Sequence, residues 1–290
     1  MKESIRNIFL IIRPYSIADV MLLGILGNVL VTGNILWNET LLRDMFYSLL
    51  WWASILLAVE YRKNDGISRN VVFAFGLITG VVTIYLSLIA FVILIINIFL
   101  LYVYSLKSKN EFMALISPFP RGCLSATLIL IVAAFHNSLD ASFIMEHAGI
   151  LSSILFVTAA RNLEGDIRDI SVDKKSLAKS LGRDKSRVIV LFLIGISSIL
   201  IGNPTVIPLL LFMALVMIKH EEPTFHRIFV ITTTFFSAEY ILYLIGYPLQ
   251  IINLLYIGML LNFTYPYVPR TKNLSKRNLH QPKGRLRWEK

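Results

Sequence analysis

Stretches of about 20 residues with few or no charges recur along the whole chain, and this pattern limits the possible fold more than any other feature. A helix of that length crosses about 30 Å of hydrocarbon. The chain is 56% hydrophobic and only 16% charged, so it departs clearly from the composition of soluble domains. The apolar runs also lack the two-residue alternation of barrel strands. We therefore predict an all-α fold, a polytopic transmembrane bundle of nine to ten helices around a central cavity open to the cytoplasm.

Ten apolar segments divide the first 265 residues, and turn-forming Gly, Pro and Asn separate several of them. They lie at 10–34, 42–59, 70–87, 89–106, 119–137, 147–163, 187–202, 204–219, 226–245 and 248–265. Because Arg13 and Pro14 interrupt the first apolar run, we expect no cleavable signal peptide. Residues 1–265 then form the transmembrane domain, and residues 266–290 form a basic cytoplasmic tail that we expect to be disordered.

The basic residues predict the orientation of the bundle. When alternate connections are assigned to one side, that side holds every Lys and Arg except Arg43. The positive-inside rule makes it cytoplasmic, so the chain is predicted to be a multi-pass cell-membrane protein with both termini inside. The net charge of +10 is then explained by orientation and by attraction to anionic lipid, and we expect no nucleic-acid partner. We infer no obligate protein partner, and the single Cys123 excludes an intrachain disulfide.

The connection between the sixth and seventh segments, "RNLEGDIRDISVDKK", carries the densest polar chemistry. Asp166, Asp169 and Asp173 have spacings of three and four, which would place them on one face of a continuing helix. Carboxylate oxygens that share Mg²⁺ with substrate phosphates are a common way to hold that metal. Lys174 and Lys175 follow at once and suit diphosphate oxygens. The alternative is a solvated helix end whose acidic side chains pair with neighbouring basic residues.

A second, poorer oxygen cluster is possible in the connection between the second and third segments, "AVEYRKNDGISRN". Glu60 and Asn64 are four residues apart at the cytoplasmic end of a predicted helix, and Asp65 follows. An ordinary helix terminus that stops at Gly66 explains the same residues equally well. The extracytoplasmic connections, such as "HNSLDASFIMEHA" at 136–148, are short or bland, so we expect the functional site to open to the cytoplasm.

Three further ionisable residues lie at or within apolar segments. Lys107 lies just past the fourth segment, where it could extend to lipid headgroups or contact an anionic substrate. Asp19 and Glu239 lie inside apolar segments, where ionisable groups are costly and often functional. Asp19 is near the predicted cytoplasmic opening and is a candidate for the substrate pocket, whereas Glu239 has no partner that the sequence indicates.

The order of these motifs over about residues 8–250 resembles the UbiA superfamily of intramembrane prenyltransferases. "IIRPYS" is similar to the Arg-Pro that opens the family's first helix. "LYVYSLKSK" is similar to the Tyr and Lys that close its fourth helix. "GDIRDISVDKKSLAKSLG" is similar to its second aspartate motif, and is the most specific of the three.

The resemblance implies a Mg²⁺-dependent enzyme that transfers a polyprenyl group from an isoprenyl diphosphate to an aromatic or lipid acceptor. By position, Asp169 and Asp173 would be metal ligands with Asp166 beside them. Lys107 and Arg69 would face the diphosphate, and Arg13 belongs to the motif of the first helix.

The chain departs from the family pattern at the first aspartate motif. In either register of "VEYRKND", Asn or Lys replaces an expected Asp, so the metal site formed by Glu60, Asn64 and Asp65 would be weak or absent. About four residues of the family pattern are also missing after Asp173, and the family usually has nine crossings. A non-catalytic relative that binds a prenyl lipid or a partner is therefore the alternative interpretation.

Overall fold

The computed structural model describes residues 17–63, 68–108, 110–171, 175–201, 234 and 236–247, and every structural statement here concerns that part of the chain. Its residues form helices and turns, without a strand. The long helices are α2 (Ile17–Thr32), α3 (Glu39–Lys63), α4 (Arg69–Leu86), α5 (Leu88–Ser105), α7 (Pro118–Phe135), α9 (Ala148–Arg168) and α11 (Arg183–Ile201). The short ones are the 3-10 helix η2 (Leu106–Ser108), α6 (Glu111–Ile116), α8 (Ala141–Glu146) and α10 (Leu177–Leu181), and residues 236–244 are also helical.

The prediction of an all-helical fold is confirmed for the described residues. The first seven predicted segments coincide with the seven long helices, and their boundaries agree to within several residues. Of the segment predicted at 226–245, the described part is its C-terminal half. The segments predicted at 204–219 and 248–265 lie outside the described residues, as does the tail at 266–290, so the full number of crossings stays a prediction.

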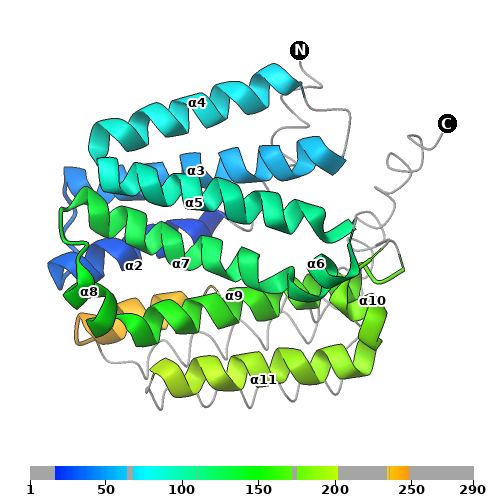
Figure 1. Cartoon of the computed structure of the whole chain (residues 1–290). Helices are drawn as coiled ribbons and strands as arrows, with labels where there is room; N and C mark the ends of the chain where they lie inside the picture. The colour runs from blue at the N-terminus through cyan, green and yellow to red at the C-terminus, as the bar shows by residue number, and fades with distance from the viewer. Residues whose placement is uncertain are drawn as a thin grey trace, which may run out of the picture.

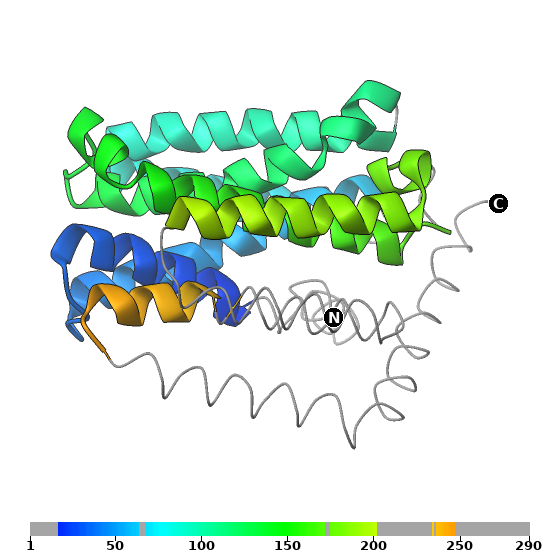
Figure 2. The same cartoon turned by 90° about the horizontal axis from the view of Figure 1, so that it is seen from below.

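Each long helix runs antiparallel to the next one along the chain, and the helices lie side by side with α4 and α11 at opposite edges of the bundle (Figure 1). We name the two ends of the bundle by one residue each. At the Lys107 end, α2, α4, α7 and α11 begin, α3, α5 and α9 end, and the short helices α6 and α10 are attached. At the opposite His136 end, α8 joins α7 to α9. Figure 2 shows the bundle from below, where α11 lies along α9 nearest the viewer.

Local sequence explains where several helices begin. Ser87 alone separates α4 from α5, and its side chain caps α5 by accepting a hydrogen bond from the Ala90 N–H at 3.3 Å. Pro118 occupies the first position of α7, where a missing N–H costs nothing. Asp140 caps α8, because its side chain accepts a hydrogen bond from the backbone N–H of Phe143. This hydrogen bond lowers the pKa of the Asp140 carboxyl group.

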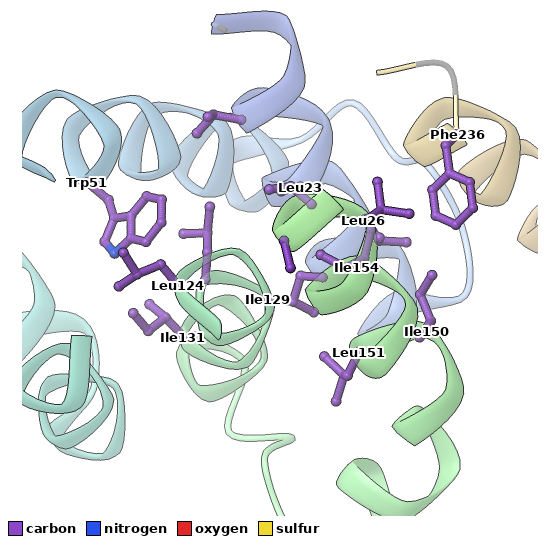
Figure 3. Packing of buried hydrophobic residues seen from close by; sticks show 14 of the residues in the cluster. Leu23, Leu26, Trp51, Leu124, Ile129, Ile131, Ile150, Leu151, Ile154 and Phe236 are labelled. Carbon is purple, nitrogen blue, oxygen red and sulfur yellow. The ribbon is translucent and has the colours of Figure 1, made fainter. Parts of the chain in front are cut away.

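The hydrophobic core runs along the middle of the bundle, where α7 is the central helix. It packs against α2, α5 and α9, and its side chains Leu128, Ile129 and Ile131 are fully buried. Figure 3 shows Leu26 of α2, Ile154 of α9 and Trp51 of α3 in the same cluster. Phe236, from the helical residues 236–244, is part of this cluster as well.

Glycines allow the closest helix crossings. A Cβ atom placed on Gly122 of α7 would lie 2.3 Å from the Leu155 carbonyl oxygen of α9, and one on Gly149 of α9 would lie 2.7 Å from the Leu200 carbonyl oxygen of α11. Ser153 and Ser197 reinforce the second crossing, since their hydroxyl oxygens are 2.5 Å apart. Small residues and hydroxyl hydrogen bonds of this kind are typical of helix packing inside membranes.

The outer faces of α4 and α5 are apolar and exposed. Phe73, Leu77 and Tyr85 of α4 and Leu88 and Phe99 of α5 are all more than half exposed. In the described part of the chain, four helical stretches are long and apolar enough to cross a bilayer: Glu39–Val59, Arg69–Leu86, Leu88–Ser105 and Pro118–Phe135. These features are compatible with a membrane protein whose α4–α5 face contacts lipid.

Candidate functional site

Lys107 and Asp166 form an ion pair at the Lys107 end of the bundle. Lys107 belongs to η2, directly after α5, and its Nζ donates a hydrogen bond to Oδ1 of Asp166, near the end of α9. The side chains are 14% and 7% exposed, respectively, so both charges are largely removed from solvent. Two residues that are 59 positions apart, each selected from the sequence for a different reason, are therefore in direct contact.

The position of Asp166 on its helix explains why it needs a cation. The C-terminal end of a helix carries partial negative charge, which disfavours a nearby carboxylate. A buried carboxylate also needs a charged or hydrogen-bonding partner to replace the water it has lost. The Lys107 ammonium supplies that partner from outside α9.

Asp19 forms a second interhelical ion pair at the same end. It lies in the first turn of α2, where the helix dipole favours an acidic side chain. Its Oδ2 accepts a hydrogen bond from Nη1 of Arg161 on α9, and both side chains are mostly buried. The prediction that Asp19 binds substrate stays untested, but its observed partner is Arg161, five residues before Asp166.

The expectation that Asp169 and Asp173 continue the helix after Asp166 is wrong for Asp169. Helix α9 ends at Arg168, and Asp169 is its C-cap. The next residues, "ISV", include two β-branched side chains that disfavour further helix. The Asp169 carboxylate accepts hydrogen bonds from Nε and Nη2 of Arg168 at 2.9 and 2.6 Å and is 37% exposed, so it faces more solvent than Asp166 does.

Several residues that complete this cluster were not predicted as site residues. Glu164 is fully buried on α9 and interacts electrostatically with Arg168, Asp169 and Arg187. Glu164 lies in the same polar stretch as Asp166, and this position was the signal from which it could have been predicted as a site residue.

Arg121 of α7 was also not selected. Its guanidinium carbon lies 4.8 Å from the ring centroid of Trp52 and 5.9 Å from that of Tyr104, which links α3, α5 and α7 at this end. No spacing rule relates these three segments.

Two predicted substrate contacts, Arg69 and Lys175, belong to neither η2 nor α9, the elements that carry Lys107 and Asp166. Arg69 is exposed as the first residue of α4, which packs chiefly on α3 and α5 rather than on α9. Lys175 is paired with Glu111 of α6 through an Nζ–Oε1 distance of 3.8 Å, and both side chains are exposed, so this contact contributes little to stability.

Several predicted site residues lie outside what the structure describes. They are Arg13, Asn64, Asp65, Asp173 and Lys174, and for Glu60 this applies to the side chain, since its backbone belongs to α3. Among the described residues, no three His, Cys, Asp or Glu side chains are placed to share a metal ion. Asp166 and Asp169 offer oxygen ligands of the type that Mg²⁺ prefers, and the remaining predicted ligands stay untested.

A separate polar network occupies the His136 end. Asp44 of α3 is fully buried, and its Oδ2 is 2.7 Å from Nε2 of His136 and accepts a hydrogen bond from Nδ2 of Asn28 at 2.8 Å. Arg43 donates a hydrogen bond from Nε to Oδ1 of Asp44 at 2.9 Å, and its Nη2 lies 2.8 Å from the same oxygen in an ion pair. This Asp44 network, formed by Asn28, Arg43, Asp44 and His136, joins α2, α3 and α7.

The Asp44 network also accounts for Arg43, the one basic residue that the charge pattern placed on the side opposite all the others. Within the described part of the chain, Arg43 is the only Lys or Arg at the His136 end, and its charge is neutralised by Asp44. The description of the 136–148 connection as bland was wrong for His136. An acidic residue inside the predicted segment 42–59 was the signal that could have revealed the network.

Comparisons with protein families, with curated proteins and with solved structures give no match for this chain.

Proposed function

We propose that this chain is an intramembrane prenyltransferase that transfers a polyprenyl group from an isoprenyl diphosphate to an aromatic or lipid acceptor. The observation that carries the proposal is the contact between Lys107 and Asp166. These residues come from the two stretches that resemble the family's fourth-helix lysine and its second aspartate motif. A shared reaction centre requires them to be close together, and they are.

In this proposal the Lys107 end faces the cytoplasm, and nine to ten crossings surround a cavity that opens there. The supporting observation is charge: apart from Arg43, the Lys and Arg residues of the described part lie at or near this end. An anionic diphosphate would approach from the side where these charges gather, because they attract it over distances of about 10 Å at moderate salt.

The residues have distinct roles in the proposed reaction. Asp166, Asp169 and Asp173 would hold Mg²⁺, with Glu60, Asn64 and Asp65 as a weaker second group. The bound metal would neutralise charge that builds up on the leaving diphosphate. Lys107 and Arg69 would donate hydrogen bonds to diphosphate oxygens, and Lys174 and Lys175 would add positive charge nearby. A surrounding apolar bundle would keep water from the allylic cation.

One observation favours the alternative of a non-catalytic protein that binds a prenyl lipid. The stretch that resembles the first aspartate motif has fewer carboxylates than the family pattern, so a diphosphate would be held chiefly by one metal group. Such a protein would retain lipid binding and lose the chemical step.

An activity assay separates the two proposals. Full-length protein in lipid nanodiscs is incubated with labelled geranylgeranyl diphosphate, Mg²⁺ and a panel of acceptors, beside Asp169→Ala and Asp173→Ala. Glu39→Gln, an exposed acidic residue at the other end, is the control. We expect turnover that both Ala variants abolish and the control retains. Absence of turnover with every acceptor, together with diphosphate binding that does not need Mg²⁺, would overturn the enzyme proposal.

A further inference from the structure

Glu239 is a buried acid that the proposed reaction does not use. It belongs to the helical residues 236–244, within the predicted apolar segment 226–245, and it is 2% exposed. Both of its carboxyl oxygens are buried, and neither has a hydrogen-bond partner. Asp44, which is also buried, instead accepts hydrogen bonds from Asn28 and Arg43. Glu239 therefore lacks the polar contacts that replace the water lost on burial.

The charged side chains described on the neighbouring helices do not act on this carboxyl group. Phe236, from the same helical residues, packs in the core cluster with Leu26 of α2 and Ile150 of α9 (Figure 3). The only charged residue of α2 is Asp19, which is paired with Arg161. The charged residues of α9 lie between Arg161 and the C-terminal end of that helix, whereas Ile150 is near its beginning. Burial is thus the dominant influence on the carboxyl group.

The surroundings of Glu239 select the ligand that its carboxyl group can take. An isolated carboxylate in an apolar interior is far more costly than the neutral acid. A metal ion needs several oxygen ligands, and no three His, Cys, Asp or Glu side chains of the described residues are placed to share one. The nearest titratable groups in the same helix are the phenols of Tyr240 and Tyr243, which are neutral at physiological pH. A proton needs only one carboxyl oxygen, so it is the ligand that fits.

We propose that Glu239 is a proton-binding site inside the bundle, which holds its proton while residues 236–244 are packed against the core and releases it when this helix moves away. On release the O–H bond breaks, the proton passes to water and the electron pair stays on the carboxylate. Water reaches the group only when the helix opens, because both oxygens are buried in the packed state. The proposal is independent of the transferase, since it uses none of the residues assigned to that reaction.

Infrared difference spectroscopy of the full chain in phosphatidylcholine nanodiscs at neutral pH tests for the bound proton. The spectrum of the wild type minus that of Glu239→Gln should contain the carbonyl band of a protonated carboxyl group. Glu39→Gln is the control, because an exposed glutamate is ionised at neutral pH and its loss should remove only carboxylate bands. Absence of the protonated band in the Glu239→Gln difference spectrum would overturn the proposal.

Transfer of the protein to D₂O tests the release of the proton. Deuterium replaces the proton when the helix opens, so the Glu239 band should move to lower wavenumber with time. Phe236→Ala removes a buried ring from the same helix and should speed this exchange by about tenfold or more. Tyr243→Ala removes an exposed ring from that helix and should leave the rate unchanged. A band that never moves, or equal exchange rates in Phe236→Ala and the wild type, would overturn the link between proton release and helix movement.

Discussion

Asp44 Oδ2 lies 2.7 Å from Nε2 of His136, and this contact ties α3 to α7 at the end of the bundle opposite Lys107. Asp44 has no exposed surface, and Arg43 and Asn28 donate to the same carboxylate. The Asp44 side chain is thus the shared hydrogen-bonding or charge partner of polar groups from three helices.

Replacement of Asp44 by Asn should therefore destabilise the protein by about 3–5 kcal/mol, because it leaves the Arg43 cation without its buried partner. The measurement is thermal or denaturant unfolding of the purified protein in one detergent. Glu39→Gln removes the same charge from an exposed position on the same helix and should change stability by about 0.5 kcal/mol or less. Equal effects of the two substitutions would show that the Asp44 network does not stabilise the bundle.

Two glycine substitutions, one at the α7–α9 crossing and one on α4 as its control, test the packing of α7 on α9. Gly122→Ala places a methyl group 2.3 Å from the Leu155 carbonyl oxygen, so the helices must separate, and we expect a loss of about 1–3 kcal/mol. Gly76→Ala on α4 meets no atom within 4 Å and should stabilise its helix by about 0.5–1 kcal/mol. The two melting temperatures, compared with that of the wild type, should move in opposite directions. A shift in the same direction would contradict the crossing described for α7 and α9.

Charge exchange between Asp19 and Arg161 distinguishes a structural from a substrate-binding role. Asp19→Arg and Arg161→Asp each place like charges together in a mostly buried contact, and each should lower stability by about 3 kcal/mol. The double variant restores an opposite pair and should regain at least half of that loss, measured without substrate. If the single variants melt like the wild type while diphosphate binding falls, Asp19 acts on the ligand rather than on α9.

Labelling from the two sides of the membrane tests the orientation. In a Cys123→Ala background, Ser68→Cys at the Lys107 end and Asn38→Cys at the His136 end both lie at exposed positions. An impermeant maleimide should label Asn38→Cys on intact cells and Ser68→Cys on inside-out vesicles, because the basic end is expected inside. Labelling of Ser68→Cys on intact cells would reverse the proposed topology and place the candidate site outside.

Much of the fold could be predicted from the sequence, because the length of an apolar run and the charges that flank it are properties of residues that are neighbours in the chain. The apolar runs at 119–137 and 147–163 became α7 and α9 with small shifts at their ends. Helix α9 extends to Arg168, five residues past the apolar run, because polar residues continue a helix once one face is buried. The short helices α6, α8 and α10 were not predicted, since six or fewer residues give no periodic signal.

Composition and spacing by themselves determined that this chain is helical, that its long segments have membrane length, and that Lys107 and Asp166 were candidates for chemistry. Only the tertiary structure decided that these two residues pair, that Asp19 meets Arg161, and that Asp44 with His136 forms a buried network. The physical reason is that burial and charge pairing depend on which helices are neighbours. Helix neighbours are set by close crossings such as Gly122 against Leu155, and such contacts between distant segments leave no periodic mark in the sequence.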